Sequence, residues 1–539
     1  SQTKRAAGLR YAPSVPVYSK GRERSNSPAQ CTAPGFFPHA SHAIMRAAAC
    51  GGESQMPDYE AIIGMEVHAQ LQTRSKMFCG CDADVFGARP NTHTCPVCLG
   101  MPGALPVINR RAVEQTIRVG LALGCQIAET AIFSRKNYVY PDLPKSYQIS
   151  MYDFPLCENG WLDVDDPNGS EGAVKRIRVR RVHLEEDTGK SFHAGDHSLL
   201  DFNRSGLPLI EIVTEPDIRS PEEARQFLVK LRAILRYLGA STGDMEKGAM
   251  RGEANVSLRT RGADELGTKV EVKNLNSFRA VKLALDYEIA RQAEALDLGE
   301  QVRQVTMGWD ERRGRTVEQR SKEESDDYRY FPEPDLPPLR ISRDWVSGIA
   351  ATLPQLPDDR QDRFISDYGL PRSDASVLAS DRQVADYFEA AVTAGREEEV
   401  DPRATANWVT GELFRLLKAG DVEIRDAKVT PSALADLIAF VEKETITAGS
   451  GRKVLAEMFA TGQQASEIIE EKQLAQISDQ DALVEIVEQV VAAHPNEAAQ
   501  YRDGKETLLQ WFVGQVIRAT RGKANPQMVR DLLQDRLDR

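Results

Sequence analysis

Four closely spaced cysteines form a specific chemical pattern in this sequence. Cys79-Gly80-Cys81 is separated by thirteen residues from Cys95-Pro96-Val97-Cys98. Two close thiol pairs joined by a loop are typical of structural Zn²⁺, which takes four thiolates in a tetrahedron and keeps no open position. A redox Cys-x-x-Cys pair and ordinary buried thiols are the alternatives. The sequence therefore predicts a structural zinc site at Cys79, Cys81, Cys95 and Cys98.

The run from Ile63 to Leu71 alternates apolar and polar side chains, as a half-buried strand does. A period of two places Glu66 and His68 next to each other on the polar face, about 6 to 7 Å apart. At this spacing both side chains could bind one cation. A solvated strand face is the alternative, because polar residues on one face of an antiparallel sheet usually contact water.

Three further carboxylates occur in or next to predicted strands, where a charge is unusual. Glu185 and Glu186 end the extended run 180–187, in which alternation sends them to opposite faces, so only one of them should join a given site. Glu211 lies inside the apolar run 207–213, where an unpaired charge would cost several kcal/mol. Glu211 therefore needs a partner, and a salt bridge to an arginine is the alternative to a metal.

Two more alternating runs carry mixed acid and base on one face. The run 251–259 contains Glu253, and the run 269–273 contains Lys273. At least four predicted strands thus display charge on one side, which is more than an inert sheet face needs. The simplest use is a concave floor that handles a charged substrate together with a divalent metal.

The elements that must position these residues predict an α+β fold with a largely antiparallel sheet, because strands and helices mix without a regular βαβ rhythm. Ser220-Pro221 begins one helix, and Ser277 precedes another. After the proline-rich stretches 331–338 and 353–357 the periodicity becomes helical. We therefore expect a catalytic cradle domain at 56–350, an all-α domain at 351–449 and a C-terminal helical tail domain at 450–539.

Composition excludes several classes of protein. The chain has 539 residues, of which 41% are hydrophobic and 27% charged, with a net charge of −12. This charge argues against nonspecific coating of nucleic acid, although it leaves room for a local basic patch. Eight cysteines are too few for a disulfide scaffold. No stretch approaches the roughly 18 consecutive apolar residues of a membrane span, so no membrane partner is expected.

Residues 1–55 differ from the rest of the chain. They contain seven Lys or Arg and two acids, with scattered Ser, Ala and Pro. A basic, acid-poor and serine-rich segment is typical of an organelle transit peptide, and a disordered arm that stays attached is the alternative. The expected location is the mitochondrion, the chloroplast or both.

Several longer phrases occur together in this sequence. They are Ile63–His68, Arg135–Tyr138, Tyr140–Ser150, His183–Asp187, Asn203–Gly206, Glu211–Asp217 and Asp326–Asp335. Their combination closely resembles the GatB subunit of the heterotrimeric glutamyl-tRNA(Gln)/aspartyl-tRNA(Asn) amidotransferase. The resemblance runs from about Tyr59 to the C-terminus and leaves out the leader.

The resemblance implies a ligase reaction that uses ATP and Mg²⁺. In that family, ATP phosphorylates the side-chain carboxyl of Glu, or Asp, on a misacylated tRNA, and ammonia then displaces phosphate. A separate amidase subunit makes the ammonia from glutamine, and a third, small subunit joins the other two. The expected partners are therefore the amidase subunit, the small subunit and misacylated Glu-tRNA(Gln), with Asp-tRNA(Asn) as a further possible substrate.

The resemblance also implies roles for individual residues. The Mg²⁺ ligands are expected to be His68, Glu186 and Glu211, which together with Glu66 form the predicted catalytic set. Glu185 is expected to support a ligand rather than to bind the ion, and an imidazole ligand would also admit Mn²⁺ or Zn²⁺. The residues expected to bind ATP or substrate, with surface or salt-bridge duty as the alternative for the basic ones, are Lys145, Lys190, Arg204, Glu253 and Lys273.

The C-terminal end of the chain reverses the overall sign of charge. Its last forty residues contain eight Lys or Arg and five acids. In the family this tail contacts the outer corner of tRNA, which implies that Arg518, Arg521 and Lys523 bind phosphates. An ordinary solvated helix is the alternative.

Two rival functions belong to other classes. A tRNA-holding scaffold would keep the sheet without kinase chemistry, and the complete set of His68, Glu186 and Glu211 favours the enzyme over it. A zinc hydrolase would need an open coordination position, which four cysteines do not offer.

Overall fold

The structure is a computed structural model that describes residues 59–166, 169–170, 172–321, 328–475, 480–520 and 523–538. The predicted leader, residues 1–55, lies outside the described residues, as do Asp326, Asp327 and Arg521.

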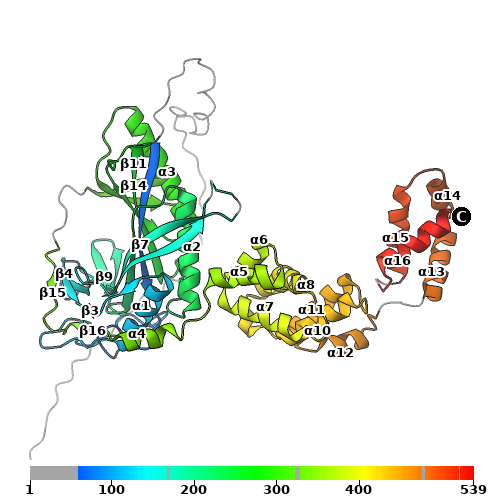
Figure 1. Ribbon diagram of the computed structural model, residues 1–539, viewed down its shortest axis with the longest axis horizontal. Coiled ribbons are helices and arrows are strands. Elements are labelled where there is room, and N and C mark those ends of the chain that lie inside the picture. Colours follow the sequence, from blue (N-terminus) through cyan, green and yellow to red (C-terminus); the bar gives the residue numbers. More distant parts are fainter. Residues whose placement is uncertain are drawn as a thin grey trace, which may run out of the picture. The chain divides into compact units, whose positions relative to one another are not determined.

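A nine-stranded sheet is the centre of the first part of the chain (Figure 1). Its strand order is β14-β13-β12-β11-β1-β10-β7-β6-β2, and every neighbouring pair is antiparallel except β12 with β13. This confirms the predicted α+β class with a largely antiparallel sheet. The strands of this sheet are β1 (Tyr59–Gln70), β2 (Gln126–Ile127), β6 (Cys157–Asp165), β7 (Val174–Glu186), β10 (Pro208–Thr214), β11 (Met250–Thr260), β12 (Val270–Leu275), β13 (Val305–Asp310) and β14 (Arg315–Ser321).

Three small sheets accompany the large one. One has three strands in the order β15-β4-β5, and the other two are the pairs β16-β3 and β8-β9. These strands are β3 (Thr130–Ala131), β4 (Ser134–Asn137), β5 (Tyr147–Ser150), β8 (Lys190–Ala194), β9 (His197–Asp201), β15 (Phe331–Pro332) and β16 (Leu339–Arg340).

Alternation along β1 divides the sheet into an apolar and a polar face. Ile63, Met65 and Val67 are fully buried, whereas Glu66 and His68, which alternate with them, are half-buried. The apolar side chains share one core with residues of α1 (Arg110–Ala122), α2 (Pro221–Tyr237) and α3 (Phe278–Asp297), and α4 (Arg343–Ala350) adds Ile349 to it. Because the helices pack against the apolar face of the sheet, the polar side chains of β1 lie on the opposite face, outside this core.

The predicted helix starts are confirmed. Ser220 accepts a hydrogen bond from the amide of Glu223, and Ser277 accepts one from the amide of Ala280. The Glu223 carboxylate bonds the amide of Arg219 rather than that of Ser220, so it fixes the approach to the helix. These caps satisfy amides that have no partner within the helix.

Two further hydrophobic cores follow in the helical part of the chain. The second core runs from Phe364 to Ile469, and the third runs from Leu483 to Leu537. The helices of the second are α5 (Pro357–Tyr368), α6 (Arg372–Ala379), α7 (Arg382–Ala394), α8 (Pro402–Asn407), a π-helical turn (Trp408–Leu413), α9 (Phe414–Gly420), a 3₁₀ turn (Ile424–Asp426), α10 (Pro431–Glu442), α11 (Ala448–Thr461) and α12 (Ala465–Glu471); those of the third are α13 (Gln480–Ala493), α14 (Pro495–Arg502), α15 (Thr507–Ala519) and α16 (Pro526–Asp538).

The domain boundary predicted between residues 449 and 450 stays a prediction. That position lies inside α11, where Gly451 is buried against Val441 and Trp408. A Cβ at Gly451 would lie 2.8 Å from Val441 Cγ2, so this glycine allows α11 to pack closely against α10. Residues up to Ile469 therefore belong with the second core, and the tail body begins with α13.

Candidate functional site

Three neighbouring strands bring acid and imidazole side chains into one row on the polar face of the sheet. In the antiparallel register, His68 of β1 lies opposite Glu211 of β10, and Glu211 lies opposite His183 of β7. Directly opposed residues have Cβ atoms about 5 Å apart, so their side chains meet without any loop to position them. Glu185, two residues beyond His183, points to the same face of β7.

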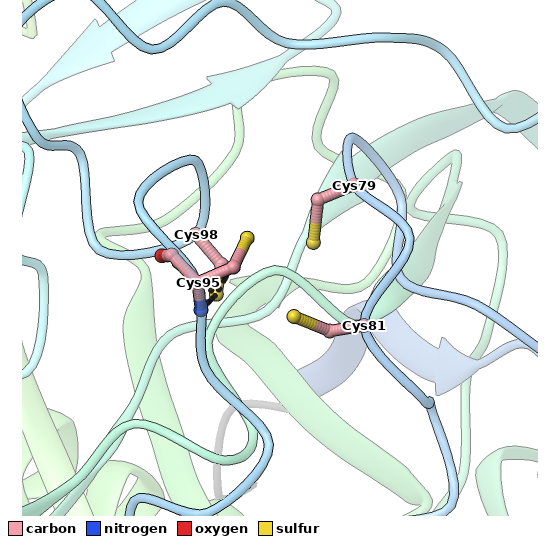
Figure 2. Close-up of side chains that lie close together, drawn as sticks. All are labelled: Cys79, Cys81, Cys95 and Cys98. Atoms are coloured by element: carbon pink, nitrogen blue, oxygen red, sulfur yellow. Dashed lines mark hydrogen bonds between the residues drawn. The ribbon is translucent and has the colours of Figure 1, made fainter.

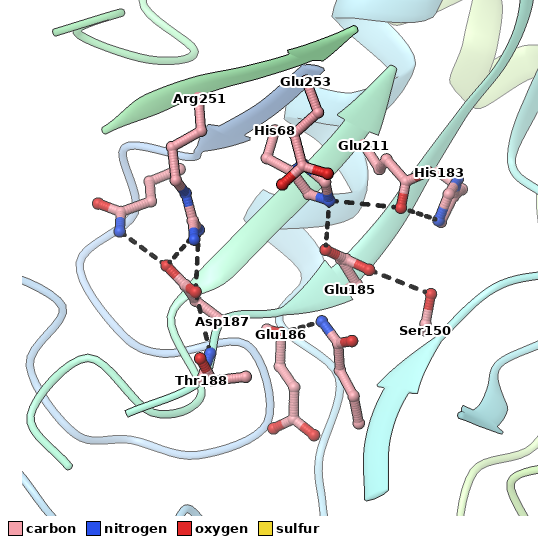
Figure 3. Close-up of polar contacts among 12 residues, drawn as sticks. His68, Ser150, His183, Glu185, Glu186, Asp187, Thr188, Glu211, Arg251 and Glu253 are labelled. Carbon is pink, nitrogen blue, oxygen red and sulfur yellow. Dashed lines mark hydrogen bonds and ion pairs between the residues drawn. The ribbon is translucent and has the colours of Figure 1, made fainter. Parts of the chain in front are cut away.

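His68 contacts two carboxylates at once (Figure 3). Its Nε2 lies 3.4 Å from Glu185 Oε1 and 3.4 Å from Glu211 Oε2. His183 Nε2 lies 3.5 Å from the same Glu211 oxygen. One ligand atom from each of His68, Glu185 and Glu211 falls within a span of 4.8 Å, which is a geometry that one divalent cation could bridge.

Glu185, and not Glu186, lies together with His68 and Glu211 in the structure, while the role of Glu186 as a Mg²⁺ ligand stays a prediction. The Glu186 carboxylate points away from His68, pairs with the Lys145 ammonium and accepts a hydrogen bond of 3.0 Å from the amide of Ile149. The alternation of β7 explains the difference, since Val182, Leu184 and Glu186 share one face and His183 and Glu185 share the other. The sequence already contained this signal in the apolar identity of residues 182 and 184.

Proton affinities in this row reflect burial and close charges. Burial disfavours the charged imidazole of His68, but its contact with Glu211 and the charge of Glu185 outweigh burial and raise the pKa of His68 to about 9. Burial raises the pKa of Glu185 to about 7. Burial would also raise the pKa of Glu211, but His183 and His68 outweigh it and lower that pKa. Burial lowers the pKa of His183 to about 4. Near pH 7, and without a metal, His68 thus carries the positive charge that a divalent cation would replace.

A second acid cluster adjoins the first through β1. Glu66 lies opposite Glu253 of β11, and together with Glu271 of β12 they place one oxygen each within 4.8 Å of one another. Burial and then repulsion by Glu211, Glu253 and Glu271 raise the pKa of Glu66. The predicted Lys273 is here, 2.8 Å from Glu253 and 3.5 Å from Glu271. Three carboxylates and one ammonium leave an excess of negative charge that suits an oxygen-binding cation such as Mg²⁺.

An ion-pair network fixes the end of β7 beside these clusters. Asp187 is buried, and both its carboxylate oxygens lie within 3.0 Å of Arg251 Nη2. Gln70 donates a further hydrogen bond of 2.8 Å to Asp187. Although burial alone would raise the pKa of Asp187, Arg251 and Arg204 outweigh it and lower that pKa. Asp187 therefore stays ionised and holds β1, β7 and β11 in register.

The other predicted ATP-binding residues lie outside the two clusters. Arg204 donates hydrogen bonds to the carbonyls of Thr188 (3.0 Å) and Gly189 (2.7 Å), and so stabilises the loop after β7. Lys190 is exposed on β8, with its Nζ 4.8 Å from the centroid of the Phe192 ring. Lys145 is nearly buried beside Glu186 and lines a pocket of about 210 Å³ together with Cys79 and Cys98.

Lys136 is a residue that the sequence interpretation missed. Its Nζ lies 5.0 Å from the centroid of Tyr328 and 5.9 Å from that of Tyr138. Burial opposes its charge, but Glu185 and Glu211 outweigh burial and raise the pKa of Lys136. Tyr328 is far from Lys136 in the sequence. Its carbonyl accepts a hydrogen bond of 3.0 Å from the amide of Asn137, which holds the tyrosine beside β4. Only the tertiary pairing of this segment with β4 shows the arrangement.

The four predicted zinc ligands converge from two loops (Figure 2). The Sγ atoms of Cys79, Cys81, Cys95 and Cys98 all lie within 4.8 Å of one another. Four sulfurs at this separation fit the tetrahedral donor set of Zn²⁺. Cys125 and Cys157 lie apart from them and are packed in the main hydrophobic core.

The predicted tRNA-binding residues lie around the end of α15. Arg518 is exposed in the last turn of that helix, and Lys523 is half-buried in the turn before α16. Arg521 lies outside the described residues.

Comparison with known proteins now defines the class to which this fold and site belong. Residues 61–347, the cradle with both acid clusters, match the family model of the GatB/GatE catalytic domain, and residues 386–537 match that of the GatB domain. Both parts of the chain are therefore those of a tRNA-dependent amidotransferase.

Relatives along nearly the whole chain make the assignment more specific. The GatB subunit of the aspartyl/glutamyl-tRNA(Asn/Gln) amidotransferase from Thermodesulfovibrio yellowstonii is 50% identical over 476 residues, which cover 88% of this chain and 98% of the relative. The same subunit from Roseiflexus is 52% identical over 485 residues (89% and 99%), and that from Dehalococcoides mccartyi is 50% identical over 494 residues (90% and 100%). The chain belongs to the GatB family of the aspartyl/glutamyl-tRNA amidotransferases, which are ligases that form Gln-tRNA(Gln) and Asn-tRNA(Asn).

None of the helices in the described ranges combines the length and the apolar character needed to cross a membrane.

Proposed function

We propose that the polar face of the sheet carries out the two chemical steps of this ligase. A side-chain carboxylate oxygen of Glu on misacylated Glu-tRNA(Gln), or of Asp on Asp-tRNA(Asn), attacks the γ-phosphorus of ATP, and ADP leaves. The nitrogen of ammonia then attacks the carbonyl carbon of the acyl phosphate, inorganic phosphate leaves and a proton is lost. The product is the amide, Gln-tRNA(Gln) or Asn-tRNA(Asn). Phosphorylation is needed because hydroxide is a poor leaving group and phosphate is a good one.

The observation that carries this proposal is the pair of adjacent carboxylate clusters joined by β1. The set of His68, Glu185 and Glu211 and the set of Glu66, Glu253 and Glu271 each fit one divalent cation. Mg²⁺, when bound, would neutralise the phosphate oxygens and align the attacking and leaving oxygens. The imidazole at the first set also admits Mn²⁺.

The chain's own residues hold this geometry before substrate arrives. Arg251 and Asp187 keep the three strands in register, and Ser150 holds Glu185 through a hydrogen bond of 3.3 Å. Lys273 and Lys136 are positioned to offset negative charge on phosphate. Lys145, Lys190 and Arg204 remain proposed phosphate contacts whose described neighbours give each of them a structural duty as well.

The cysteine cluster is proposed to bind zinc in a structural role. Its four sulfurs leave no position for a substrate or water, so its contribution is to fix the loops that carry them. The cluster is therefore separate from the phosphoryl chemistry.

The partners follow from the family. The amidase subunit would supply ammonia, the small subunit would join it to this chain, and the tail body would bind the outer corner of tRNA through Arg518, Arg521 and Lys523. The two described residues of this set are accessible or half-buried at the end of α15, which supports the proposal. The composition of residues 1–55 supports delivery of the protein to mitochondria or chloroplasts.

A non-catalytic tRNA-holding scaffold is the competing function. The experiment that separates them measures ATP hydrolysis and Gln formation on Glu-tRNA(Gln), with ammonium supplied and the partner subunits present. Glu211→Ala should abolish both, whereas Glu265→Ala, which removes an exposed carboxylate from the loop before β12, should change neither. Equal turnover by the wild type and Glu211→Ala would remove this site from the mechanism.

A further inference from the structure

Lys76 is a charged residue with no exposed surface at all. Its Nζ lies 2.7 Å from the Ser205 carbonyl oxygen, 3.4 Å from the Phe202 carbonyl oxygen and 3.8 Å from Cys98 Sγ. Among the described residues, no carboxylate lies within ion-pair distance of it. Carbonyl groups supply dipoles but no countercharge, and burying an unpaired ammonium costs several kcal/mol.

The cysteine cluster is the only source of countercharge in contact with this ammonium among the described residues. Lys76 Nζ lies 3.8 Å from Cys98 Sγ, so a thiolate at Cys98 would face the ammonium directly. Four thiolates around one Zn²⁺ carry a net charge of −2, so an adjacent cation offsets half of it. The ammonium and the thiolates thus each lower the free energy of burying the other.

The turn at residues 202–206 is attached to the loop that carries Cys95 and Cys98. Asn203 donates a hydrogen bond of 2.7 Å to the Arg89 carbonyl and accepts one of 2.8 Å from the amide of His93. Ser205 Oγ donates one of 3.1 Å to the Cys98 carbonyl.

Gly206 makes this attachment a close one. Its φ of +82° lies in the left-handed region, and a Cβ there would lie 3.3 Å from Cys98 Cβ. Any side chain at this position would strain the backbone and crowd Cys98, so glycine favours the close contact between the turn and the cluster.

The same turn holds the end of β7. The Gly206 amide donates a hydrogen bond of 2.8 Å to the Asp187 carbonyl, and the Asp187 amide donates one of 2.8 Å to the Leu207 carbonyl. Arg204 bonds the carbonyls that follow Asp187. Glu185 of the first acid cluster lies two residues before Asp187, so a displaced turn would disturb the strand that positions it.

We propose that Lys76 is the counter-ion of the zinc–thiolate cluster and a positioning residue that couples this cluster to the 202–206 turn and the catalytic end of β7. The inference deepens the structural zinc role proposed above and rests on it. In this proposal the zinc site has a specific structural role, which is to hold the 202–206 turn in contact with the end of β7.

The first test measures how firmly zinc is held in the assembled amidotransferase. Zinc content is followed during competition with a chromophoric chelator for the wild type, Lys76→Met, which keeps the side-chain length, and Lys76→Gln, which keeps an N–H donor without charge. Loss of an outer partner of a metal ligand typically weakens metal binding by about 10- to 100-fold, so both neutral variants should lose zinc at correspondingly lower chelator concentration. Lys175→Met, which removes a lysine paired with buried Glu223 at 2.7 Å, is the matched control and should retain zinc.

The second test follows hydrogen exchange of the backbone amides. Removing zinc from the wild type should accelerate exchange at residues 79–98 and also at Gly206 and Asp187. In Lys76→Met the latter two amides should exchange fast even with zinc bound. If Lys76→Met fails to assemble, Lys76→Gln carries the same comparison.

Three results would overturn the inference, and they are distinguishable. Zinc retention in Lys76→Met equal to that of the wild type removes the counter-ion role. Acceleration confined to residues 79–98 on zinc removal removes the coupling. A wild type that binds no zinc, established first by metal analysis, refutes the zinc proposal itself and the lysine role with it.

Discussion

Glu185 and Glu186 are adjacent in sequence but are expected to fail in opposite ways when each is changed to glutamine. Glu185 belongs to the cluster with His68 and Glu211, whereas Glu186 pairs with Lys145 on the other face of β7. Both side chains are almost fully buried. A difference between the two variants therefore reflects the face of β7 on which each side chain lies, and not a difference in burial.

The magnitudes follow from what each change leaves behind. Glu186→Gln leaves the Lys145 ammonium, whose side chain is 9% exposed, without its partner, and removing one member of a buried pair costs about 3–5 kcal/mol. Glu185→Gln removes a charge that burial already disfavours, as the raised pKa of about 7 shows, so the metal-free protein should change by less than about 1 kcal/mol. Loss of a charged group at the reacting centre should lower turnover by about 100-fold or more.

The assay has two arms. The first arm measures stability by urea unfolding of the cradle in the presence of chelator, monitored by hydrogen exchange in β5 to β7. The second arm measures turnover as the formation of Gln-tRNA(Gln) with ammonium, at a temperature where both variants are folded. Glu185→Gln should be stable and inactive, and Glu186→Gln should be unstable with turnover within about tenfold of the wild type. The reverse pattern, with Glu185→Gln unstable and active, would refute the placement of Glu185 at the metal site.

The remaining predictions concern pH, the cysteines and the tail. The pKa of His68 is raised to about 9 in the folded, metal-free protein, so its stabilising contribution should be complete below about pH 6.5 and lost as the pH rises through 9; unfolding of the wild type and His68→Asn against pH, in chelator, should converge above that range. Cys98→Ser should lower zinc content and melting temperature, and metal analysis together with calorimetry checks both; zinc content equal to that of the wild type would contradict the four-thiolate site. Deleting residues 476–539, which spares the second core, should weaken tRNA binding but leave ATP binding intact, and filter binding of both ligands would expose the opposite result. Lys523→Gln should reduce the slope of log affinity against log salt by about 1, and an unchanged slope would remove Lys523 from the tRNA contact.

Much of the fold could be predicted from local patterns. The alternating runs became β1, β7, β11 and β12, because a strand beside a hydrophobic core must place every second side chain against that core. The helix starts at Ser220 and Ser277 were equally readable, since a hydroxyl before the first turn satisfies its free amides. The helix that spans the predicted boundary at residue 449 was less readable, because the close packing of Gly451 against Val441 and Trp408 depends on the tertiary structure.

The candidate site was predictable in its parts but not in its assembly. His68, Glu211 and the cysteines were identified, whereas the resemblance pointed to Glu186 and the alternation of β7 favours Glu185. Lys136 and Lys76 gave no local signal of a role, because their importance comes from neighbours more than a hundred residues away in the sequence.

The sequence by itself determined which side chains have the chemistry, which of them share a strand face, and the family to which they belong, since these depend on residue identity and on a period of two. Only the tertiary structure decided which strands are neighbours and in what register. Opposing His68, Glu211 and His183 across β1, β10 and β7 requires strands from three distant parts of the chain to pair, and that choice is made by the burial of their common apolar face against the helices. The same burial leaves the acids together on the other face, where their mutual repulsion creates the demand for a cation.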